Sequence, residues 1–300
     1  MHRRNKNKDK YNLEEMVKTS PDLAKYIITT PAKTTSVDFS NPRAVKVLNR
    51  AILQHYYGIR YWDFPDNNLC PAIPGRAEYI HLVADLLAKD NAGQPPKGKG
   101  IRCLDVGTGA GCVYPIIGVT EYGWSFIGSE VDKASIQSAE KIVVDNPSLV
   151  KNIGLRHQTH PNHIFHKIIR NEDLFDLTIC NPPFHASIQA ATMGTSRKNK
   201  NLKTKTPNNK QSNFSGQHHE LVFKGGEVGF IKIMIQESKR YAYKVKWFTT
   251  LVSKDKHMKT IMKTLTAAKP ATVETLELAT GNKKTRILCW SYLEKEDRKY

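Results

Sequence analysis

From residue 76 onward, short apolar runs alternate with amphipathic segments of helical length, and this alternation constrains the fold more than any other feature. The runs of strand type are 101–106, 124–128, 153–157, 175–180, 245–252, 272–278 and 285–290. The segments of helical type are 76–89, 111–120, 133–145, 162–170, 227–243 and 255–268. Strands separated by helices predict an α/β fold with a mainly parallel sheet covered on both faces. The last two runs are expected to form the closing strand pair.

The first 75 residues do not follow this pattern. Residues 1–20 are polar and basic at their start, and we expect a flexible basic arm there. Residues 21–75 are rich in proline and aromatic residues, and they contain one segment with helical spacing, 42–57. Asn41 is a candidate N-cap for that helix, and Pro42 suits its first turn. We interpret 21–75 as a small accessory module that either packs against the domain at 76–300 or contacts the substrate.

The charge balance favours a polyanionic partner. Lys and Arg total 46 against 28 Asp and Glu, a formal net charge of +18. The five cysteines form no Cys-x-x-Cys pair and indicate no zinc or other metal site, and three lie in apolar strand-like runs, as buried thiols in a reducing cytosol do. No apolar run is long enough to span a membrane, and the N-terminus does not resemble a secretory signal. We expect a cytoplasmic protein that binds nucleic acid, and a monomer because no dimerisation signal stands out.

One stretch concentrates this positive charge. No acidic residue occurs from Asn181 through His219, directly after the 175–180 strand. We expect residues 185–219 to form a basic mobile loop that grips phosphates, the alternative being an ordinary solvated loop. The candidate RNA-binding residues in it are Arg197, Lys198, Lys200, Lys203, Lys205 and Lys210.

A glycine-rich turn, Asp105-Val106-Gly107-Thr108-Gly109-Ala110-Gly111, follows the 101–106 strand. Gly107 and Gly109 permit a tight turn and let a ligand approach the backbone. Glu130 lies 25 residues beyond Asp105, at the end of the next strand, where a carboxylate can accept both ribose hydroxyls of a nucleoside. NAD is the competing ligand, but the Gly-x-Gly-x-Gly spacing lacks the third glycine of the dinucleotide pattern.

A second turn, Asn181-Pro182-Pro183-Phe184, follows the 175–180 strand. The exocyclic amine of adenine is a poor nucleophile because its lone pair is delocalised into the ring. The Asn181 side-chain oxygen and the Pro182 carbonyl can accept hydrogen bonds from both N–H groups of such an amine, an effect realised mainly near the transition state. Phe184 can stack on the base. Together, the two turns predict a methyl donor in one pocket and an acceptor amine in the next.

These motifs resemble those of the bacterial large-subunit ribosomal RNA adenine-N6 methyltransferases, which act on one adenine of 23S RNA. The matching segments include Pro71-Ala72-Ile73-Pro74-Gly75-Arg76, the glycine-rich turn, Gly128-Ser129-Glu130-Val131-Asp132, Cys180-Asn181-Pro182-Pro183-Phe184-His185 and Gly225-Gly226-Glu227-Val228. The Asn-Pro-Pro-Phe element alone also occurs in DNA and protein-glutamine methyltransferases, whereas its combination with the first and last of these segments is specific.

The resemblance implies a Rossmann-like class I methyltransferase fold with a seven-stranded sheet, and S-adenosylmethionine as cofactor. The residues that it implies around the cofactor are Arg76, Asp105, Gly107, Gly109, Glu130 and Asn181. Within this set, Asp105 would lie near the methionine amino group and Glu130 would hold the ribose. The residues implied around the target base are Asn181, Pro182 and Phe184. The polar contact that relatives make after the third strand is not matched around His160 and Pro161.

The implied reaction is methylation of N6 of a specific adenine in 23S ribosomal RNA, either as RNA or within a large-subunit assembly particle. The target base must leave its stack to reach the pocket. The alternatives are a DNA adenine-N6 methyltransferase, a protein-glutamine N5 methyltransferase, and a non-catalytic RNA-binding protein that keeps the fold.

Overall fold

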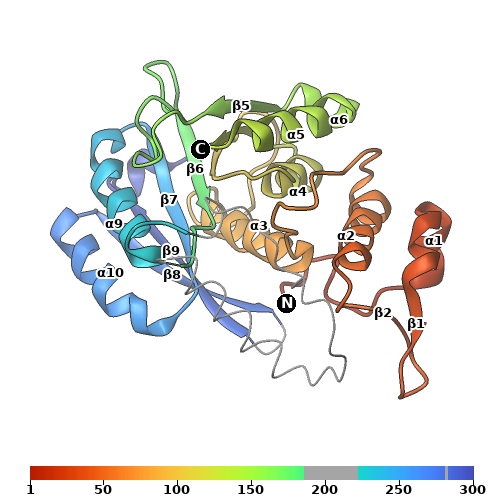
Figure 1. Ribbon diagram of the computed structural model, residues 1–300. Coiled ribbons are helices and arrows are strands. Elements are labelled where there is room, and N and C mark those ends of the chain that lie inside the picture. The colour runs from red at the N-terminus through yellow and green to blue at the C-terminus, as the bar shows by residue number, and fades with distance from the viewer. Residues whose placement is uncertain (186–221, 281–282) are drawn as a thin grey trace.

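The sheet is the centre of the molecule. The computed structural model describes residues 1–185, 222–280 and 283–300, and within these ranges seven strands form one sheet in the order β5-β4-β3-β6-β7-β9-β8 (Figure 1). The strands are β3 (Arg102–Val106), β4 (Ser125–Glu130), β5 (Ile153–His157), β6 (Phe175–Cys180), β7 (Val245–Val252), β8 (Thr272–Thr280) and β9 (Lys283–Ser291). Neighbours pair in parallel, except that β9 runs antiparallel to β7 and β8. The predicted mainly parallel seven-stranded sheet with an antiparallel closing strand is confirmed.

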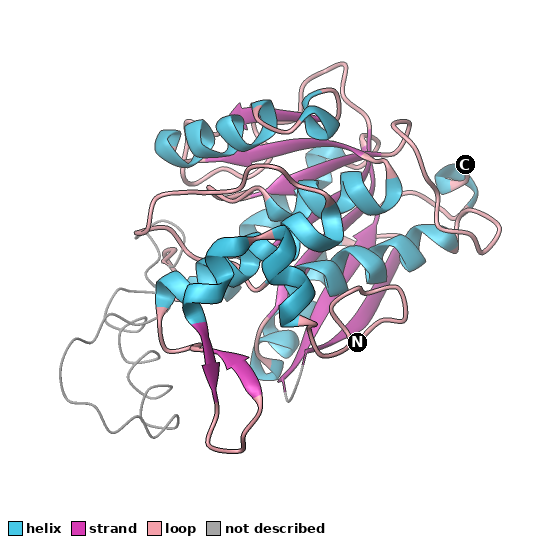
Figure 2. Cartoon of the chain, turned by 90° about the vertical axis from the view of Figure 1, so that its right-hand side faces the viewer, coloured by secondary structure: helices cyan, strands magenta, loops and turns pink. Residues whose placement is uncertain are grey.

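Helices cover both faces of this sheet, as Figures 1 and 2 show. One core cluster contains residues of α3 (Ile73–Ala88), α4 (Val113–Tyr122) and α5 (Lys133–Val144), and the other contains residues of α9 (Gly226–Ser238) and α10 (Asp255–Ala268). Short helical turns complete these layers: α6 (Pro147–Val150), η2 (Lys239–Tyr241) and η3 (Glu296–Arg298). Strand side chains alternate between the clusters, since Cys103 belongs to the first and Leu104 to the second. Burial on both faces explains the continuous apolar runs in the sequence.

The module at 21–75 shares its core with the main domain. Its elements are η1 (Pro21–Tyr26), β1 (Ile27–Thr29), β2 (Thr35–Val37) and α2 (Pro42–Tyr57). Buried residues of η1 and α2, such as Leu23 and Ile52, belong to the same cluster as α3 and α4. The antiparallel β1–β2 hairpin extends away from this cluster (Figure 2). The structure therefore shows that the module packs against the main domain, one of the two interpretations given above.

Helix α2 spans the residues predicted for it, 42–57. Its first turn is capped by Asn41, whose Oδ1 accepts from the backbone N–H of Arg43 (3.0 Å) and Ala44 (3.4 Å). It ends at Gly58, which has the left-handed φ of +67° that suits glycine after a helix. No helix within the described ranges combines the length and the apolar character needed to cross a bilayer.

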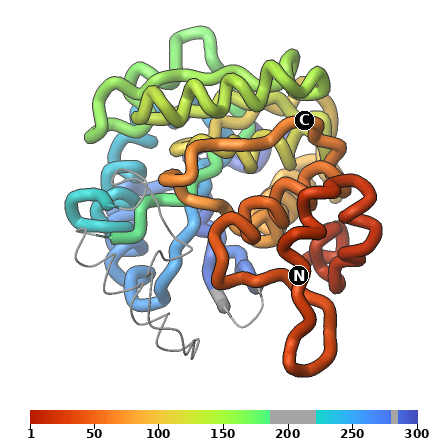
Figure 3. Tube along the Cα trace, turned by 45° about the vertical axis from the view of Figure 1, so that its right-hand side comes forward, coloured from red at the N-terminus to blue at the C-terminus, as the bar shows by residue number. Residues whose placement is uncertain are grey.

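The expectation of a flexible arm at residues 1–20 is wrong. This segment packs beside α2 and α3 (Figure 3) and contains helix α1 (Leu13–Thr19). The backbone N–H of His2 lies 2.8 Å from both carboxylate oxygens of Glu78, and the Arg4 guanidinium pairs with Asp85. The basic composition was misleading because its partners are acidic residues of α3, about 75 positions away in the sequence.

The strand order reverses between β3 and β6, and this reversal positions the site. In register, Val106 at the end of β3 lies opposite Ser129 of β4 and Cys180 of β6. One residue further along, these three strand ends present Gly107, Glu130 and Asn181 at the same edge of the sheet. Ligands of open parallel sheets bind in the crevice at such a switch point.

Candidate active site

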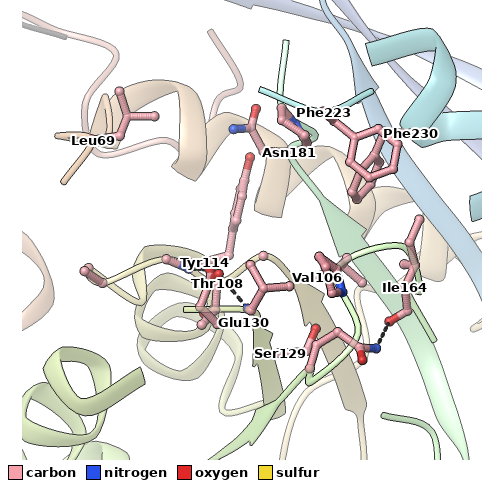
Figure 4. Close-up of a pocket in the computed structure, with 18 of the residues that line it drawn as sticks. Leu69, Val106, Thr108, Tyr114, Ser129, Glu130, Ile164, Asn181, Phe223 and Phe230 are labelled. Carbon is pink, nitrogen blue, oxygen red and sulfur yellow. Dashed lines mark hydrogen bonds between the residues drawn. The ribbon is translucent and has the colours of Figure 1, made fainter. Parts of the chain in front are cut away.

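A cavity of about 340 Å³ lies at this edge of the sheet (Figure 4). Its lining comes from the end of the N-terminal module, the glycine-rich turn, the end of β4, the loop after β5, the turn after β6 and the start of α9. Five of the predicted site residues line it: Arg76, Gly107, Gly109, Glu130 and Asn181. Segments far apart in the sequence therefore meet in one cavity.

Three other predicted residues border the cavity without lining it. Asp105 is fully buried at the end of β3, and Pro182 is buried. Phe184 is half-buried and packs against the first core cluster. The six candidate RNA-binding residues lie outside the described residues: Arg197, Lys198, Lys200, Lys203, Lys205 and Lys210.

The glycine-rich turn depends on glycine for its backbone angles. Gly107 and Gly109 have φ of +72° and +64°, in the left-handed region that L side chains rarely adopt. A Cβ at either position would meet no atom within 4 Å, so conformation rather than space requires glycine. The backbone N–H groups of Gly107 and Thr108 both donate to the Ser129 carbonyl, at 2.9 and 3.0 Å. These bonds hold the turn against β4.

The Glu130 carboxylate is oriented by three backbone N–H groups. Its Oε2 accepts from Gly109 at 3.0 Å, and its Oε1 accepts from Val131 at 2.7 Å and Asp132 at 3.2 Å. A carboxylate offers about four lone-pair sites, so acceptor capacity remains for hydroxyl groups. This geometry suits the role predicted for Glu130, the holding of a ribose.

Asp105 differs from Glu130 because no backbone N–H group holds its carboxylate. It is 0% exposed, and neither oxygen has a hydrogen-bond partner of regular geometry among the described residues. Burial raises the pKa of Asp105 to about 7; the neighbouring Thr108 hydroxyl and the charge of Arg76 lower it, and the charge of Glu130 raises it. Buried polar groups are rarely left unpaired, so an unpaired carboxylate beside a cavity indicates that a ligand completes its bonds.

Arg76 connects the two halves of the cavity. Its Nη1 donates to the Asn181 Oδ1 over a long 3.5 Å, and its guanidinium lies over the Tyr114 ring, 5.2 Å from the centroid. Figure 4 shows Asn181 and Tyr114 facing each other, Asn181 at the end of β6 and Tyr114 on α4. The Asn181 amide is thus directed into the cavity, and among the described residues its side chain has one long hydrogen bond, from Arg76.

The loop after β5 forms one wall of the cavity, and the helix predicted at 162–170 is wrong. The structure has turns there, without a regular helix, and Lys167 has a left-handed φ of +63°. The Glu237 side chain of α9 holds this loop in place. Its Oε2 accepts from the backbone N–H groups of Ile164, Phe165 and His166, at 3.0, 2.8 and 3.3 Å. A carboxylate from elsewhere in the chain thus satisfies three consecutive backbone donors of the loop.

Gln158 holds the same loop from the other side. Its Oε1 accepts from the backbone N–H of His160 at 3.0 Å, and its Nε2 donates to the His166 carbonyl at 3.0 Å. The amide of Gln158 lines the cavity but is bonded to the loop that it supports. Its role in this structure is to shape the wall.

Three aromatic residues that line the cavity were not predicted from the sequence: Tyr114, Phe223 and Phe230. The rings of Phe223 and Phe230 pack edge to face, with centroids 5.2 Å apart. The available signal was position alone, since Phe223 and Phe230 flank the Gly-Gly-Glu-Val segment and Tyr114 follows the glycine-rich turn by three residues.

The fold and this cavity together define a Rossmann-like, S-adenosylmethionine-dependent methyltransferase. Two solved structures share the architecture. The human Mettl16 catalytic domain in complex with MAT2A 3′UTR hairpin 1 matches with a TM-score of 0.81 and 27% identity, over 98% of this chain and 96% of that one. The N-terminal domain of human METTL16 in complex with SAH matches with a TM-score of 0.76 and 26% identity, over 98% of this chain and 99% of that one.

The family is narrower than this class. A family model described as RNA methyltransferase matches residues 1–294. The ribosomal RNA large subunit methyltransferase F of Flavobacterium johnsoniae is 48% identical over 301 residues, covering 100% of this chain and 95% of the relative. The enzyme of the same name from Pseudomonas entomophila is 46% identical, covering 97% of this chain and 93% of the relative. The chain belongs to this RNA methyltransferase family, and the predicted resemblance is confirmed.

Proposed function

We propose that this protein methylates N6 of a specific adenine in 23S ribosomal RNA, with S-adenosylmethionine as methyl donor. The observation that carries the proposal is the position of Asn181, in the same cavity as Gly107 and Glu130 and at the start of a proline-stiffened turn. Relatives named as ribosomal RNA large subunit methyltransferases, similar over nearly the full chain, support ribosomal RNA as the substrate.

The residues around the cavity fit the donor. Glu130 is held by backbone N–H groups at the end of β4, where its carboxylate oxygens can accept from a ribose hydroxyl, and Asp105 is a buried carboxylate that can accept from the donor's ammonium group. Arg76, which contacts both Tyr114 and Asn181, is the cation that we assign to the carboxylate of the same amino-acid end; Lys224 also lines the cavity. Bound S-adenosylmethionine supplies an electrophilic methyl group on its sulfonium. The residues of the protein bind and orient it.

The acceptor half requires hydrogen-bond acceptors and no general base. Asn181 Oδ1 and the Pro182 carbonyl would accept from the two N–H groups of the flipped adenine, which favours a lone pair localised on nitrogen. Phe184 would stack on the base, a contact worth about 1–3 kcal/mol. Among the described residues, the Asn181 oxygen receives the 3.5 Å bond from Arg76, which a substrate amine can replace.

The rest of the RNA would be held through charge and shape. The net charge of +18 favours phosphate contacts, and six basic residues of the 185–219 segment follow the turn that carries Asn181. We propose that these residues contact the RNA backbone around the flipped base. The proposed substrate places the reaction in the cytoplasm, on 23S RNA or a large-subunit assembly particle.

The test is transfer of a labelled methyl group from S-adenosylmethionine to ribosomal RNA from a strain that lacks the protein. DNA and a protein extract serve as parallel acceptors, and the modified position is mapped by mass spectrometry. We expect label on one adenine of 23S RNA, at N6, and none on the other acceptors. Label on DNA adenine or on protein glutamine would overturn the substrate, and the absence of any transfer would overturn the enzyme assignment.

A further inference from the structure

Tyr114 has a position that the reaction described so far does not use. It lies in the first turn of α4, directly after the glycine-rich turn, and it lines the cavity while being only 5% exposed. Figure 4 shows its ring extending across the cavity toward Asn181. The hydroxyl is therefore placed between the donor half and the acceptor half of the site.

The Tyr114 hydroxyl has a proton to donate and no acceptor for it. It is buried and has no hydrogen-bond partner of regular geometry among the described residues. The nearest cation, Arg76, lies over the ring, and a guanidinium carries only donors, so it cannot accept the phenol proton. Burial raises the pKa of Tyr114, which keeps the hydroxyl protonated. A buried hydroxyl of this kind is costly unless a ligand accepts from it.

The ring itself is held firmly. It packs edge to face against Tyr79, with centroids 5.2 Å apart and planes at 80°. The Tyr79 hydroxyl in turn bonds Thr249 at 3.0 Å and approaches the Cys180 carbonyl at 3.5 Å, next to Asn181. The Tyr114 hydroxyl is thus preorganised by packing, although none of the described residues accepts its proton in regular geometry.

We propose that the Tyr114 hydroxyl donates a hydrogen bond to the carboxylate at the amino-acid end of S-adenosylmethionine. The choice of carboxylate follows from charge. Arg76 stands beside the ring, and an anion there gains from the guanidinium as well as from the hydroxyl. The donor's ammonium group has no lone pair to accept the proton. It can itself donate a hydrogen bond to the buried carboxylate of Asp105. A neutral nitrogen of an adenine base carries no net charge, so the Arg76 guanidinium would not attract it as it attracts a carboxylate.

This inference rests on S-adenosylmethionine as the donor and not on the identity of the RNA, so it is tested by binding without RNA. The variant Tyr114→Phe removes only the hydroxyl. The probes are S-adenosylhomocysteine, which has the carboxylate, and 5′-methylthioadenosine, which lacks the amino-acid end. We expect the Kd for S-adenosylhomocysteine to rise about 10- to 100-fold, as for a lost hydrogen bond to a charged group, and the Kd for 5′-methylthioadenosine to stay unchanged.

The unfolding temperature gives a second measurement. If Tyr114 had only a structural role, Tyr114→Phe would lower this temperature. Because none of the described residues accepts the hydroxyl proton, Tyr114→Phe is expected to unfold at the same temperature as the wild type or a higher one. The matched control is Tyr122→Phe on the same helix, whose hydroxyl bonds Arg4 at 2.9 Å and His81 at 2.8 Å. That variant is expected to lose stability and to bind both probes normally.

Three results would overturn the proposal. Unchanged affinity of Tyr114→Phe for S-adenosylhomocysteine, with reduced methylation, would assign the hydroxyl to the acceptor base. Equal losses for both probes together with a lower unfolding temperature would make Tyr114 a structural residue. A wild-type protein that binds neither probe would contradict the donor itself, which is distinguishable from an error in the RNA substrate because no RNA is present.

Discussion

The polar groups on two sides of the cavity differ in how far the protein satisfies their hydrogen bonds. On the wall after β5, the carboxylate of Glu237 and the amide of Gln158 are fully engaged by the loop backbone. On the side of β3 and α4, the Asp105 carboxylate and the Tyr114 hydroxyl have no regular partner among the described residues. The comparison teaches which groups build the site and which are left for a ligand.

The difference has a physical basis. A buried carboxylate that receives several backbone N–H groups stabilises the local chain, whereas one without partners costs free energy in the absence of ligand. Each side carries a carboxylate, so the residue types alone do not distinguish them. The prediction is that substitutions on the β5 wall act on stability first, and that substitutions at the strand ends act on binding or transfer first.

The largest effect is expected from Asn181→Ala. Asn181 has one long bond to Arg76 and faces the cavity, so its amide is assigned to the acceptor. Loss of one such transition-state contact is expected to lower kcat about 100- to 1,000-fold. Binding of S-adenosylhomocysteine, measured by calorimetry, should change little. Near-normal turnover on ribosomal RNA would contradict the assignment of Asn181.

The next largest effect is a loss of stability, expected from a substitution that releases the loop after β5. Glu237→Ala removes the acceptor for three backbone N–H groups and for the His163 Nδ1 contact at 2.8 Å. We expect a loss of about 2–3 kcal/mol in the free energy of unfolding, measured by denaturant titration. Glu237→Gln, which keeps an acceptor oxygen, should lose less. If Glu237→Ala is as stable as the wild type and only weakens ligand binding, the distinction between the two walls fails.

A further prediction concerns the β3 side of the cavity. It compares how the stability of Asp105→Asn and that of the wild type depend on pH. Burial raises the pKa of Asp105 from 3.8 to about 7, with Glu130 adding to the shift and Arg76 opposing it. The folded state therefore binds a proton that the unfolded state has lost between about pH 4 and pH 7, and this carboxyl lowers the stability of the wild type as pH rises through that window.

Asparagine carries no titrating proton, so the stability of Asp105→Asn relative to the wild type should increase from about pH 5 to pH 8. Urea titrations of both proteins at the two pH values, without ligand, measure this change. A stability difference that is constant with pH would show that folding does not disfavour the ionised form of the Asp105 carboxyl.

The smallest effect on methylation is expected from neutralising Arg197, Lys198, Lys200 and Lys203 together, since we assign these residues to RNA phosphates. Binding of S-adenosylhomocysteine should be unaffected. The affinity for RNA should fall, and the slope of log K against log salt should become shallower by about 3 if all four contact phosphates. Unchanged RNA affinity at several salt concentrations would remove the segment from the interface.

Local sequence patterns were sufficient for most of the fold. The apolar runs match the strands, and the helical segments 42–57 and 255–268 match α2 and α10 in both bounds. Turn chemistry also located Gly107 and Asn181 at the same sheet edge, because parallel strands end together at a switch point. These features depend on residues close in sequence or on regular pairing.

The errors arose where a distant side chain decides the local structure. The loop at 162–170 is fixed by Glu237, about 70 residues later, which accepts three of its backbone N–H groups. The N-terminal segment is docked because His2 and Arg4 meet Glu78 and Asp85. Tyr114 was missed for a different reason, since an unpaired hydroxyl can be recognised only when all its neighbours are placed.

The most direct test of the account is a crystal structure of the protein with S-adenosylhomocysteine. The account predicts the ribose hydroxyls at Glu130, the ammonium group at Asp105, and the carboxylate within hydrogen-bond distance of Arg76 and the Tyr114 hydroxyl, with the sulfur facing Asn181. An amino-acid end bound instead by Gln158 or Glu237, with Asp105 and Tyr114 still without partners, would contradict it.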